Sequence, residues 1–328
     1  MRQKLLDILD RFPLRKILVV GDLIADEFLY GQISRVSREA PVLVLEYRNL
    51  IRLPGGAANA VNNLLDLGCK ATIAGVVGQD DPGKRLAEIL RNKGANIRPL
   101  RRIRSYATPI KTRILAGAQH SAPQQVVRVD RLHNPGSQVQ PSWNLLSQSL
   151  RTADGIIVSD YGYGTITPGL FARLRTAAKQ KGIPITVDSR FRMSEFQSAT
   201  SMTPNITELE ASTGISIGNN SALLRNIGQR ILQAQRLQSL LVTQGRFGMT
   251  LFARRKSPLH IPIYGTDEVA DVTGAGDTVI AVFTLALACG ASPEQAARLA
   301  NYAGGIVVMK RGTATLTCEE LADAIAGD

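Results

Sequence analysis

The sequence has few of the residues that mark disulfide-rich, membrane or nucleic-acid-binding proteins. Cysteine occurs three times in 328 residues, as Cys69, Cys289 and Cys318, and no two of these form a C-x-x-C pair. A chain of this length buries enough apolar surface to be stable without disulfides or a structural metal. We therefore expect three reduced thiols in a cytosolic protein.

Long hydrophobic runs are also missing. The longest apolar stretch, TVIAVFTLALACG at 278–290, is shorter than the ~20 residues that a membrane-spanning helix needs, so it predicts a buried helix. The amino-terminal stretch MRQKLLDILDRF places Asp7 and Asp10 among its leucines. This pattern predicts a short amphipathic helix and not a signal peptide, and we expect a cytoplasmic protein with no membrane partner.

Aromatic residues make up only 5% of the chain, which is too few for a surface that stacks single-stranded nucleic acid. The net charge is +12, but Lys and Arg are scattered except for small clusters at 98–104 and 254–256. Nucleic-acid binding usually places basic residues on one face or stripe. We therefore expect no nucleic-acid partner, and the positive charge better suits a small phosphorylated ligand.

Apolar runs typical of buried strands alternate with helical patterns along most of the chain. This alternation predicts a parallel sheet with helices on both faces, which is a three-layer α/β/α sandwich. No long linker or repeat divides the sequence, so we expect one domain over 1–328. The strands are expected at 16–22, 70–78, 155–161, 184–189 and 239–245, and the helices at 57–68, 82–94 and 168–181.

Two segments depart from this alternation. Residues 28–53 and 106–130 alternate apolar and polar side chains and contain turn signals, as antiparallel strands with one solvent-facing side do. They precede and follow the first strand–helix–strand unit, so they can meet in space as a small separate sheet. Such a sheet beside an α/β core suits a lid or a dimer surface.

A glycine-rich stretch, DVTGAGDT at 271–278, ends in an acid. The apolar run after it predicts the start of a helix, whose first N–H groups are unpaired and carry partial positive charge. The small residues Gly274, Ala275 and Gly276 let an anion approach these groups, while Asp277 beside them can accept a proton from a hydroxyl. The alternative is structural, because an acid in its first turn stabilises any helix.

Three further polar segments follow predicted strands or open predicted helices. In open α/β sheets, binding sites form at the carboxyl ends of the strands, so the fold can gather these segments with the glycine-rich stretch. They are VVGDLIAD with Asp22 and Asp26, PGGAAN with Gly55, Gly56 and Asn59, and TPNITELE with Asn205 and Glu208.

Four ordered motifs resemble those of the PfkB-type, ribokinase-like sugar kinases. LPGGAANAVNNLLDLG (53–68) is similar to the family's Gly-Gly helix start followed by Asn, and DVTGAGDT to its D-x-T-G-A-G-D signature. TPNITELE resembles its T-P-N-x-x-E segment, and VTQGRFG (242–248) its T-x-G-x-x-G nucleotide segment. The resemblance covers roughly 16–317. It implies a ribokinase-like sandwich with a mainly parallel central sheet and a small β-sheet lid.

Within this family the sequence is most similar to the kinases for D-glycero-β-D-manno-heptose 7-phosphate. Those kinases phosphorylate the anomeric hydroxyl of an already phosphorylated sugar, on the route to nucleotide-activated heptose for lipopolysaccharide. This chain has Tyr163 where that group has lysine, and Ser189-Arg190 where it has Pro-Lys, so the phosphosugar that fits stays open. The likeness is carried by GDLIADEFLYGQISRVSREAPV (21–42), QQVVRVD (124–130), SDYGYG (159–164) and DVTGAGDTVIA (271–281).

The resemblance implies roles for the residues near the sugar. Asp277 is the expected catalytic base, and the amides of 274–276 form the expected anion hole. For Asp22, a sugar contact and a structural role stay equally open. The residues expected to contact the sugar are Asp26, Gly55, Gly56 and Asn59.

Cations on the two lid segments are candidates for holding the sugar's own phosphate. A guanidinium group binds phosphate through two parallel hydrogen bonds, which makes arginine well suited to this task. For each of these cations the alternative is a solvated surface charge. They are Arg35, Arg38, Lys111, Arg113 and Arg128.

The nucleotide side of the site follows from the same resemblance. Asn205 and Glu208 are expected to order Mg²⁺ and the phosphates, Glu208 through water, although Asn205 followed by Glu208 also fits a helix cap. Asp271 and Thr273, near Gly312, match a monovalent-cation site, so K⁺ is a further expected cofactor. The residues expected around ATP are Thr243, Gly245, Gly248 and Asn301, the last with helix packing as its alternative.

The implied reaction is ATP-dependent phosphorylation of a sugar or sugar phosphate, performed by a homodimer. One alternative is a kinase of the same fold for ribose, fructose or another phosphosugar. A second is a kinase-like binding protein without catalysis. Bifunctional relatives continue into a nucleotidyltransferase domain, and because this sequence ends at 328 we expect that second activity to be absent.

Overall fold

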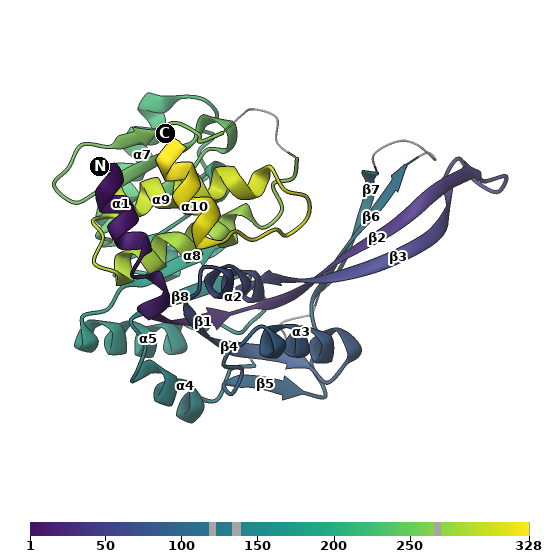
Figure 1. The fold of residues 1–328 in the computed structure, drawn as a ribbon, viewed down its shortest axis with the longest axis horizontal. Helices are drawn as coiled ribbons and strands as arrows, with labels where there is room; N and C mark the ends of the chain where they lie inside the picture. The colour runs from purple at the N-terminus through teal and green to yellow at the C-terminus, as the bar shows by residue number, and fades with distance from the viewer. Residues whose placement is uncertain (118–122, 133–138, 266–269, 328) are drawn as a thin grey trace.

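The computed structural model describes residues 1–117, 123–132, 139–265 and 270–327, and its strands form two sheets (Figure 1). Seven neighbouring strands of the large sheet are parallel, as expected, and a hairpin that we did not expect adds two antiparallel strands at one edge. The order across the nine described strands is β13 (Leu259–Ile261), β12 (Met249–Ala253), β11 (Ser239–Thr243), β10 (Ser201–Met202), β9 (Ile185–Ser189), β8 (Gly155–Asp160), β1 (Lys16–Gly21), β4 (Lys70–Gly78) and β5 (Leu100–Ile103).

Helices cover both faces of this sheet and create two hydrophobic cores. Successive residues of a strand point to opposite faces, so Ile17 and Val19 of β1 join one core while Leu18 and Val20 join the other. The first core contains residues of α1 (Arg2–Leu9), α2 (Ala57–Asp66), α3 (Asp81–Asn92), α8 (Ala275–Ala288), α9 (Pro293–Val308) and α10 (Cys318–Gly327). The second contains residues of α4 (Trp143–Leu150), α5 (Pro168–Lys181), α6 (Ile206–Thr213) and α7 (Ser221–Ala234).

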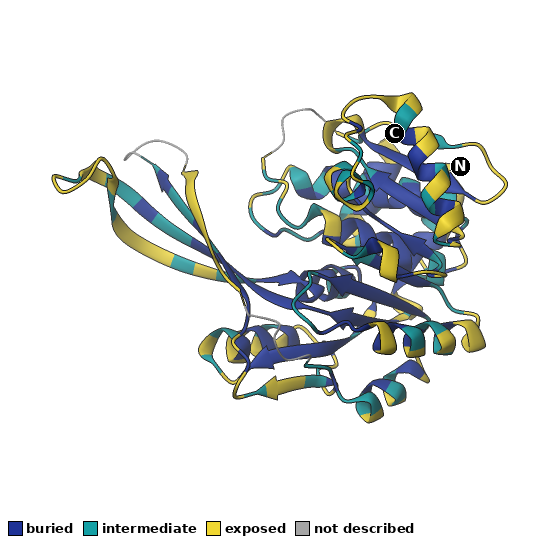
Figure 2. Cartoon of the chain, turned by 180° about the vertical axis from the view of Figure 1, so that it is seen from behind, coloured by how far each residue is buried: buried dark blue, intermediate teal, exposed yellow. Residues whose placement is uncertain are grey.

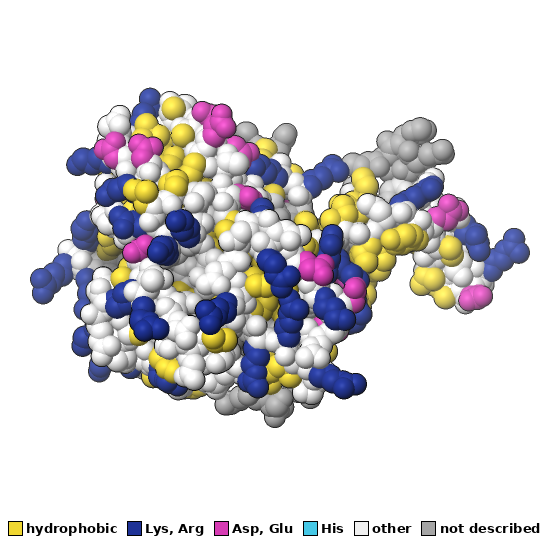
Figure 3. All heavy atoms as spheres, turned by 60° about the horizontal axis from the view of Figure 1, so that its bottom comes forward, with side chains coloured by type: hydrophobic (Ala, Val, Ile, Leu, Met, Phe, Trp, Pro, Cys, Tyr) yellow, Lys and Arg dark blue, Asp and Glu magenta, His cyan; other side chains and the backbone are white. Residues whose placement is uncertain are grey.

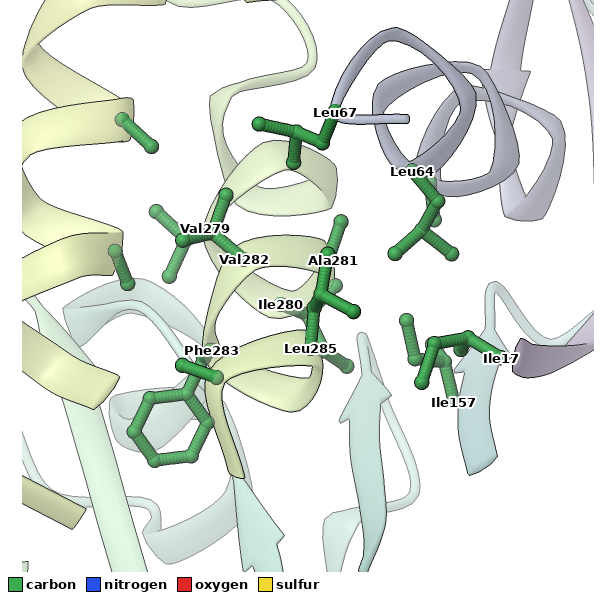
Figure 4. Packing of buried hydrophobic residues seen from close by; sticks show 14 of the residues in the cluster. Ile17, Leu64, Leu67, Ile157, Val279, Ile280, Ala281, Val282, Phe283 and Leu285 are labelled. Carbon is green, nitrogen blue, oxygen red and sulfur yellow. The ribbon is translucent and has the colours of Figure 1, made fainter. Parts of the chain in front are cut away.

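Helix α8 forms the centre of the first core. Figure 4 shows its side chains between α2 and the strands, with Leu285 close to Ile17 and Ile157. Ile280, Phe283 and Leu285 are fully buried, and burial of each such side chain stabilises the fold by roughly 1.5–3 kcal/mol. The apolar run is therefore a core helix, as expected. Within the described ranges, none of the helices combines the length and hydropathy needed to cross a bilayer.

The small sheet projects from the large one (Figure 1). Both segments expected to form it contribute strands, although 118–122 lies outside the described residues. The expectation of antiparallel pairing throughout is wrong for β2 and β6, which are parallel because both leave the body in the same direction. The order is β3 (Leu43–Gly56), β2 (Leu23–Val36), β6 (Ile110–Gly117) and β7 (Gln124–Arg131).

Burial falls along the small sheet from its base to its tip. Ala25 and Phe28 are buried where β2 leaves the body, whereas β7 is exposed along its whole length. Figure 2 shows this change from buried to exposed residues. The base of the small sheet can therefore form a wall of a site, while its outer part faces solvent.

Candidate active site

A cavity of about 270 Å³ lies where the carboxyl ends of the central strands meet the base of the small sheet and the start of α8. This is the edge at which open α/β sheets form their sites. Its walls bring together segments from both ends of the chain. The expected site residues that line it are Asp26, Gly56, Lys111, Arg113, Arg128, Asn205, Glu208, Thr243, Thr273, Gly274, Gly276 and Asp277.

Asp277 lies in the first turn of α8 with both carboxylate oxygens hydrogen-bonded. Asn59 Nδ2 donates to Oδ2 over 3.0 Å, and the Tyr161 hydroxyl donates to Oδ1 over 3.0 Å. Burial of this residue, which is 4% exposed, raises the pKa of Asp277 to about 7, while the two hydrogen bonds and Lys111 act in the opposite direction. A carboxylate with such a pKa is suited to accept a proton near neutral pH.

The start of α8 leaves backbone donors free beside this carboxylate. Gly274 precedes the helix with φ of 80°, a left-handed conformation that favours glycine. Within the described residues, the N–H groups of Gly276 and Asp277 meet no acceptor, whereas Ala275 N–H donates to Val272 O over 3.2 Å. Of the expected donors, Gly274 and Gly276 line the cavity and their N–H groups have no acceptor among the described residues, whereas Ala275 already has a partner and does not line the cavity.

Asn59, which the sequence assigns to the sugar, contacts the Asp277 carboxylate instead. Its side chain is fully buried and does not line the cavity. Besides Asp277, Asn59 Nδ2 reaches Gly274 O over 3.3 Å, and Asn59 Oδ1 accepts from Asn63 over 3.3 Å. Because its amide is used in these contacts, Asn59 can affect a ligand only through Asp277 and the α8 start.

Asp26 forms a buried ion pair with Arg113. Arg113 Nη1 lies 2.6 Å from Asp26 Oδ1, and the two residues are 9% and 5% exposed. Burial raises the pKa of Asp26, and the charge of Arg113 opposes this. A Cβ atom at Gly55 would collide with Asp26 Oδ2. Gly55 thus makes room for Asp26 and not for the sugar, while Gly56 does line the cavity.

Asp22 makes the contacts that the structural alternative implies. Its carboxylate is fully buried and accepts backbone N–H groups from Tyr161 at 2.8 Å, Tyr163 at 3.0 Å and Thr165 at 3.2 Å. It does not line the cavity. Asp22 therefore anchors the loop after β8, and this loop carries Tyr161.

The cations expected on the small sheet, apart from Arg113, differ in burial and in their partners. Lys111 is nearly buried, with Nζ 4.7 Å from the centre of the Tyr161 ring. Arg128 lines the cavity but pairs with Asp130 over 2.9 Å. Arg35 and Arg38 are exposed towards the tip of the small sheet and do not line the cavity, so both fit the alternative of solvated surface charges.

Asn205 and Glu208 form the helix cap that was the alternative to a functional role. Asn205 Oδ1 accepts from Glu208 N over 2.8 Å, and Glu208 Oε2 accepts from Asn205 N over 3.0 Å. Both residues nevertheless line the cavity, together with Asp188 at the end of β9. Burial, and then repulsion from Glu208, raise the pKa of Asp188. Two neighbouring carboxylates beside a cavity suit Mg²⁺, which keeps several of its waters.

A larger cavity of about 710 Å³ adjoins the first, and Asn205 and Thr243 line both. Gly245, whose contact with a nucleotide stays a prediction, lies in its wall. Gly248 does not, because it has φ of 80° and lies against the β12–β13 hairpin, where a Cβ would collide with Ile261 O. Asn301 also lies outside the wall, and its Nδ2 donates to Pro262 O over 2.8 Å. Gly248 and Asn301 therefore support the wall of this cavity and do not line it.

The candidate cation segment is closed by hydrogen bonds of Asp271. Its Oδ1 accepts from Thr273 N over 2.9 Å, and its Oδ2 accepts from Gly312 N over 3.0 Å. The expected proximity to Gly312 is present. Each oxygen of Asp271 retains one acceptor position that is able to ligate a cation. K⁺ binding therefore stays a prediction.

Among the cavity residues that had no role assigned from the sequence, three bear directly on the chemistry of the site. Tyr161 bonds to Asp277, Asp188 faces Glu208, and Arg190 lines the cavity with no carboxylate of the described chain within ion-pair distance. All three lie at or just beyond the carboxyl ends of β8 and β9. The rule that locates sites at these strand ends was the signal that could have identified them.

Comparisons with known proteins identify the family and the fold of the chain. Residues 14–320 match the family model described as pfkB family carbohydrate kinase. The bifunctional protein HldE of Trichlorobacter lovleyi is 39% identical over 99% of this chain and 66% of its own length. HldE of Geobacter metallireducens is 41% identical over 93% of this chain and 61% of its own length. The chain thus spans about two thirds or less of these relatives.

Solved structures show the same fold at lower identity. Arabidopsis thaliana ribokinase complexed with ribose and ATP has a TM-score of 0.73 and 21% identity, covering 95% of this chain and 98% of its own. Phosphofructokinase-2 from Escherichia coli in complex with potassium also has a TM-score of 0.73, with 20% identity and the same coverage. With the family match over most of its length, the chain belongs to the pfkB family of carbohydrate kinases and is a sugar-phosphorylating enzyme.

Proposed function

We propose that this carbohydrate kinase transfers the γ-phosphoryl group of ATP to the anomeric hydroxyl of D-glycero-β-D-manno-heptose 7-phosphate. The observation that carries the proposal is the buried Asp277 carboxylate beside the unpaired N–H groups of Gly276 and Asp277. The heptose-kinase motifs in the sequence and the similarity to HldE proteins support this choice of sugar.

In this mechanism the ionised Asp277 accepts the proton of the attacking hydroxyl. Its oxygens each keep one acceptor position after bonding to Asn59 and Tyr161. The hydroxyl oxygen attacks the γ-phosphorus in line, and the free amides at the α8 start stabilise the charge on the transferred group. The larger cavity, which shares Asn205 and Thr243 with the first, suits ATP.

Asp188 and Glu208 would hold Mg²⁺ beside the ATP phosphates, mainly through water. When bound, Mg²⁺ neutralises the negative charge of the phosphates. Asp271 and Thr273 would bind K⁺ near the same helix start. The three free cysteines and the use of ATP fit a cytoplasmic enzyme.

The sugar's own phosphate would bind to cations that line the cavity. Arg113 is occupied by Asp26 and Arg128 by Asp130. Lys111 and Arg190 line the cavity without an ion pair within the described residues, so they are the best-placed donors for a phosphate dianion. Asp26 would accept hydrogen bonds from sugar hydroxyls through its free oxygen.

The small sheet would serve as a lid and as a dimer surface. Its exposed apolar side chains include Val42, Tyr47, Ile51, Val127 and Val129, each between 40% and 64% exposed. Hydrophobic side chains follow the small sheet in Figure 3. Such an exposed apolar sheet is typical of a surface that pairs with a second copy of the chain.

Nucleic acid is not a proposed partner. Lys and Arg side chains are spread over most of the face shown in Figure 3 and do not form a stripe. A kinase for a different sugar is the second candidate, because Tyr163 and Ser189-Arg190 depart from the heptose-kinase pattern.

A panel of sugars tests the proposal. ADP release would be measured with D-glycero-β-D-manno-heptose 7-phosphate, the same heptose without its phosphate, ribose, fructose and fructose 6-phosphate. The proposal expects the highest kcat/KM with the heptose phosphate. A higher value with another sugar would assign the chain to that substrate, and the absence of ADP release with every sugar would contradict the kinase activity itself.

A further inference from the structure

The hydrogen bond from Tyr161 to Asp277 links the candidate base to the SDYGYG segment (159–164), whose first tyrosine had no role assigned from the sequence. Tyr161 is the first residue after β8, and its hydroxyl lies 3.0 Å from Asp277 Oδ1. Asn59 holds the other oxygen, Oδ2, at the same distance. Two donors, one for each oxygen, restrain the rotation of the carboxylate about its last bond.

The position of Tyr161 is itself fixed by several contacts. Asp22 accepts the Tyr161 N–H over 2.8 Å and also binds the N–H groups of Tyr163 and Thr165. A Cβ atom at Gly56 would lie 3.1 Å from Tyr161 Cε2, so the ring fits closely against β3. Lys111 Nζ lies 4.7 Å from the centre of the Tyr161 ring. The hydroxyl therefore has little freedom to leave Asp277.

We propose that Tyr161 is a positioning residue for the base: its hydroxyl orients the Asp277 carboxylate towards the reacting hydroxyl, and Asp22 holds the loop that carries it. This inference rests on the proposed function of Asp277. It also gives Asp22, a buried acid that does not line the cavity, a role in catalysis through two intermediate residues.

The hydrogen bond also has an electrostatic consequence. A hydroxyl that donates to a carboxylate favours its ionised form, so Tyr161 and Asn59 lower the pKa of Asp277 against the larger effect of burial. The other charged groups that face Asp277 are Asp26, which raises its pKa, and Lys111, which lowers it. Asp277 in turn raises the pKa of Asp188. Burial, and then Asp277, raise the pKa of Tyr161 well above its usual value, so its hydroxyl stays a donor at any working pH.

The test is the pH dependence of kcat for Tyr161→Phe, with saturating ATP, Mg²⁺ and the best sugar of the panel. This variant keeps the ring and removes only the donor. We expect the pH at which kcat falls on the acidic side of the profile, its acidic limb, to rise by about one unit or more. At a given pH below neutral, this shift lowers kcat roughly tenfold. Near pH 9.5, where Asp277 is ionised again, kcat should recover to within about threefold of the wild-type value.

Tyr163→Phe is the matched control, because it removes a hydroxyl from the same loop and its ring stacks on Tyr161 at 6.4 Å. Its acidic limb should stay where the wild-type enzyme has it, whatever its effect on KM. An unmoved limb in Tyr161→Phe, with kcat within about threefold of the wild-type value at every pH, would overturn the inference. A thermal unfolding curve confirms that each variant is folded.

Asp277→Asn separates this inference from the proposed function. If this variant keeps wild-type turnover at all pH values, the assignment of the base fails and the role of Tyr161 fails with it. If Asp277→Asn is inactive while Tyr161→Phe keeps both the wild-type limb and a kcat within about threefold of wild type, only the positioning role is contradicted. An upward shift of that limb together with an inactive Asp277→Asn supports both.

Discussion

Asn59 Nδ2 donates a 3.0 Å hydrogen bond to Asp277 Oδ2, and the two residues are 218 positions apart in the chain. The bond joins the first turn of α2 to the first turn of α8. A Cβ atom at Gly274 would lie 2.5 Å from Asn59 Nδ2, so the glycine before α8 is needed for this close approach. The glycine-rich stretch and the Asn-containing helix start therefore form one structural unit.

The first prediction concerns stability against pH. The folded-state pKa of Asp277, about 7, lies above its usual value of 3.8, so its contribution to stability is fully present below 3.8 and is lost as the pH rises through about 7. Asp277→Asn removes this cost of ionisation. We expect it to raise the free energy of unfolding by ~1–3 kcal/mol at pH 8, measured by urea denaturation, and by less at pH 5.

The exposed substitution Asp10→Asn is the control for that experiment. It removes an exposed carboxylate, whose ionisation carries no cost of burial, so its effect on stability should not depend on pH in the same way. A stability gain in Asp277→Asn that is the same at both pH values would contradict the raised pKa of the Asp277 carboxyl.

The second prediction concerns the buried pair of Asp26 and Arg113. Arg113→Met leaves the Asp26 charge buried without a partner, so we expect the free energy of unfolding to fall by ~3–5 kcal/mol in urea denaturation. The double variant Asp26→Asn, Arg113→Met should recover most of this loss, yet its KM for the sugar should stay at least about tenfold raised. A double variant with normal KM would show that Asp26 does not bind the sugar.

The third prediction separates capping from phosphate binding at α6. Glu208→Gln keeps an acceptor for Asn205 N but removes the charge. We expect its stability to stay within ~0.5 kcal/mol of wild type while the Mg²⁺ concentration for half-maximal rate rises about tenfold or more. In Asn205→Ala the lost cap should cost ~1 kcal/mol of stability. Unchanged Mg²⁺ dependence in Glu208→Gln would limit Glu208 to the cap.

The fourth prediction concerns the sugar's phosphate. Arg190 has no ion pair among the residues that the structure describes, so Arg190→Gln breaks no salt bridge. We expect KM for the phosphorylated heptose to rise by about tenfold or more, with little change for the unphosphorylated one. Arg38→Gln, at the tip of the small sheet, is the control. A KM that rises for ATP instead would assign Arg190 to the nucleotide phosphates.

Much of the fold follows from the sequence because its signals are local. The strand expected at 70–78 and the helix expected at 168–181 have the predicted bounds, since a buried apolar run and a Thr-Pro helix start act within a few residues. The parallel pairing of β2 and β6 was not predicted. It depends on where two distant segments leave the body, which neither segment encodes alone.

The candidate site shows the same limit. A motif predicts which residues gather at a sheet edge, but it does not predict the partner of each side chain. Asn59 and Asp22 are polar and close to the cavity, yet their groups are bound to Asp277 and to the 161–165 loop. Tyr161 lies in the SDYGYG stretch, which predicts the family but not the role of this tyrosine, because its contact with Asp277 depends on packing across α8, β3 and β8.

The central claim is that Asp277 is the base of a sugar kinase. Asp277→Asn has nearly the same shape and cannot accept the proton, so it should bind ATP and the sugar with Kd values within about threefold of wild type, measured by calorimetry. Its kcat should fall by about three orders of magnitude or more. Turnover within about tenfold of wild type, in a variant that binds both substrates normally, would contradict the account.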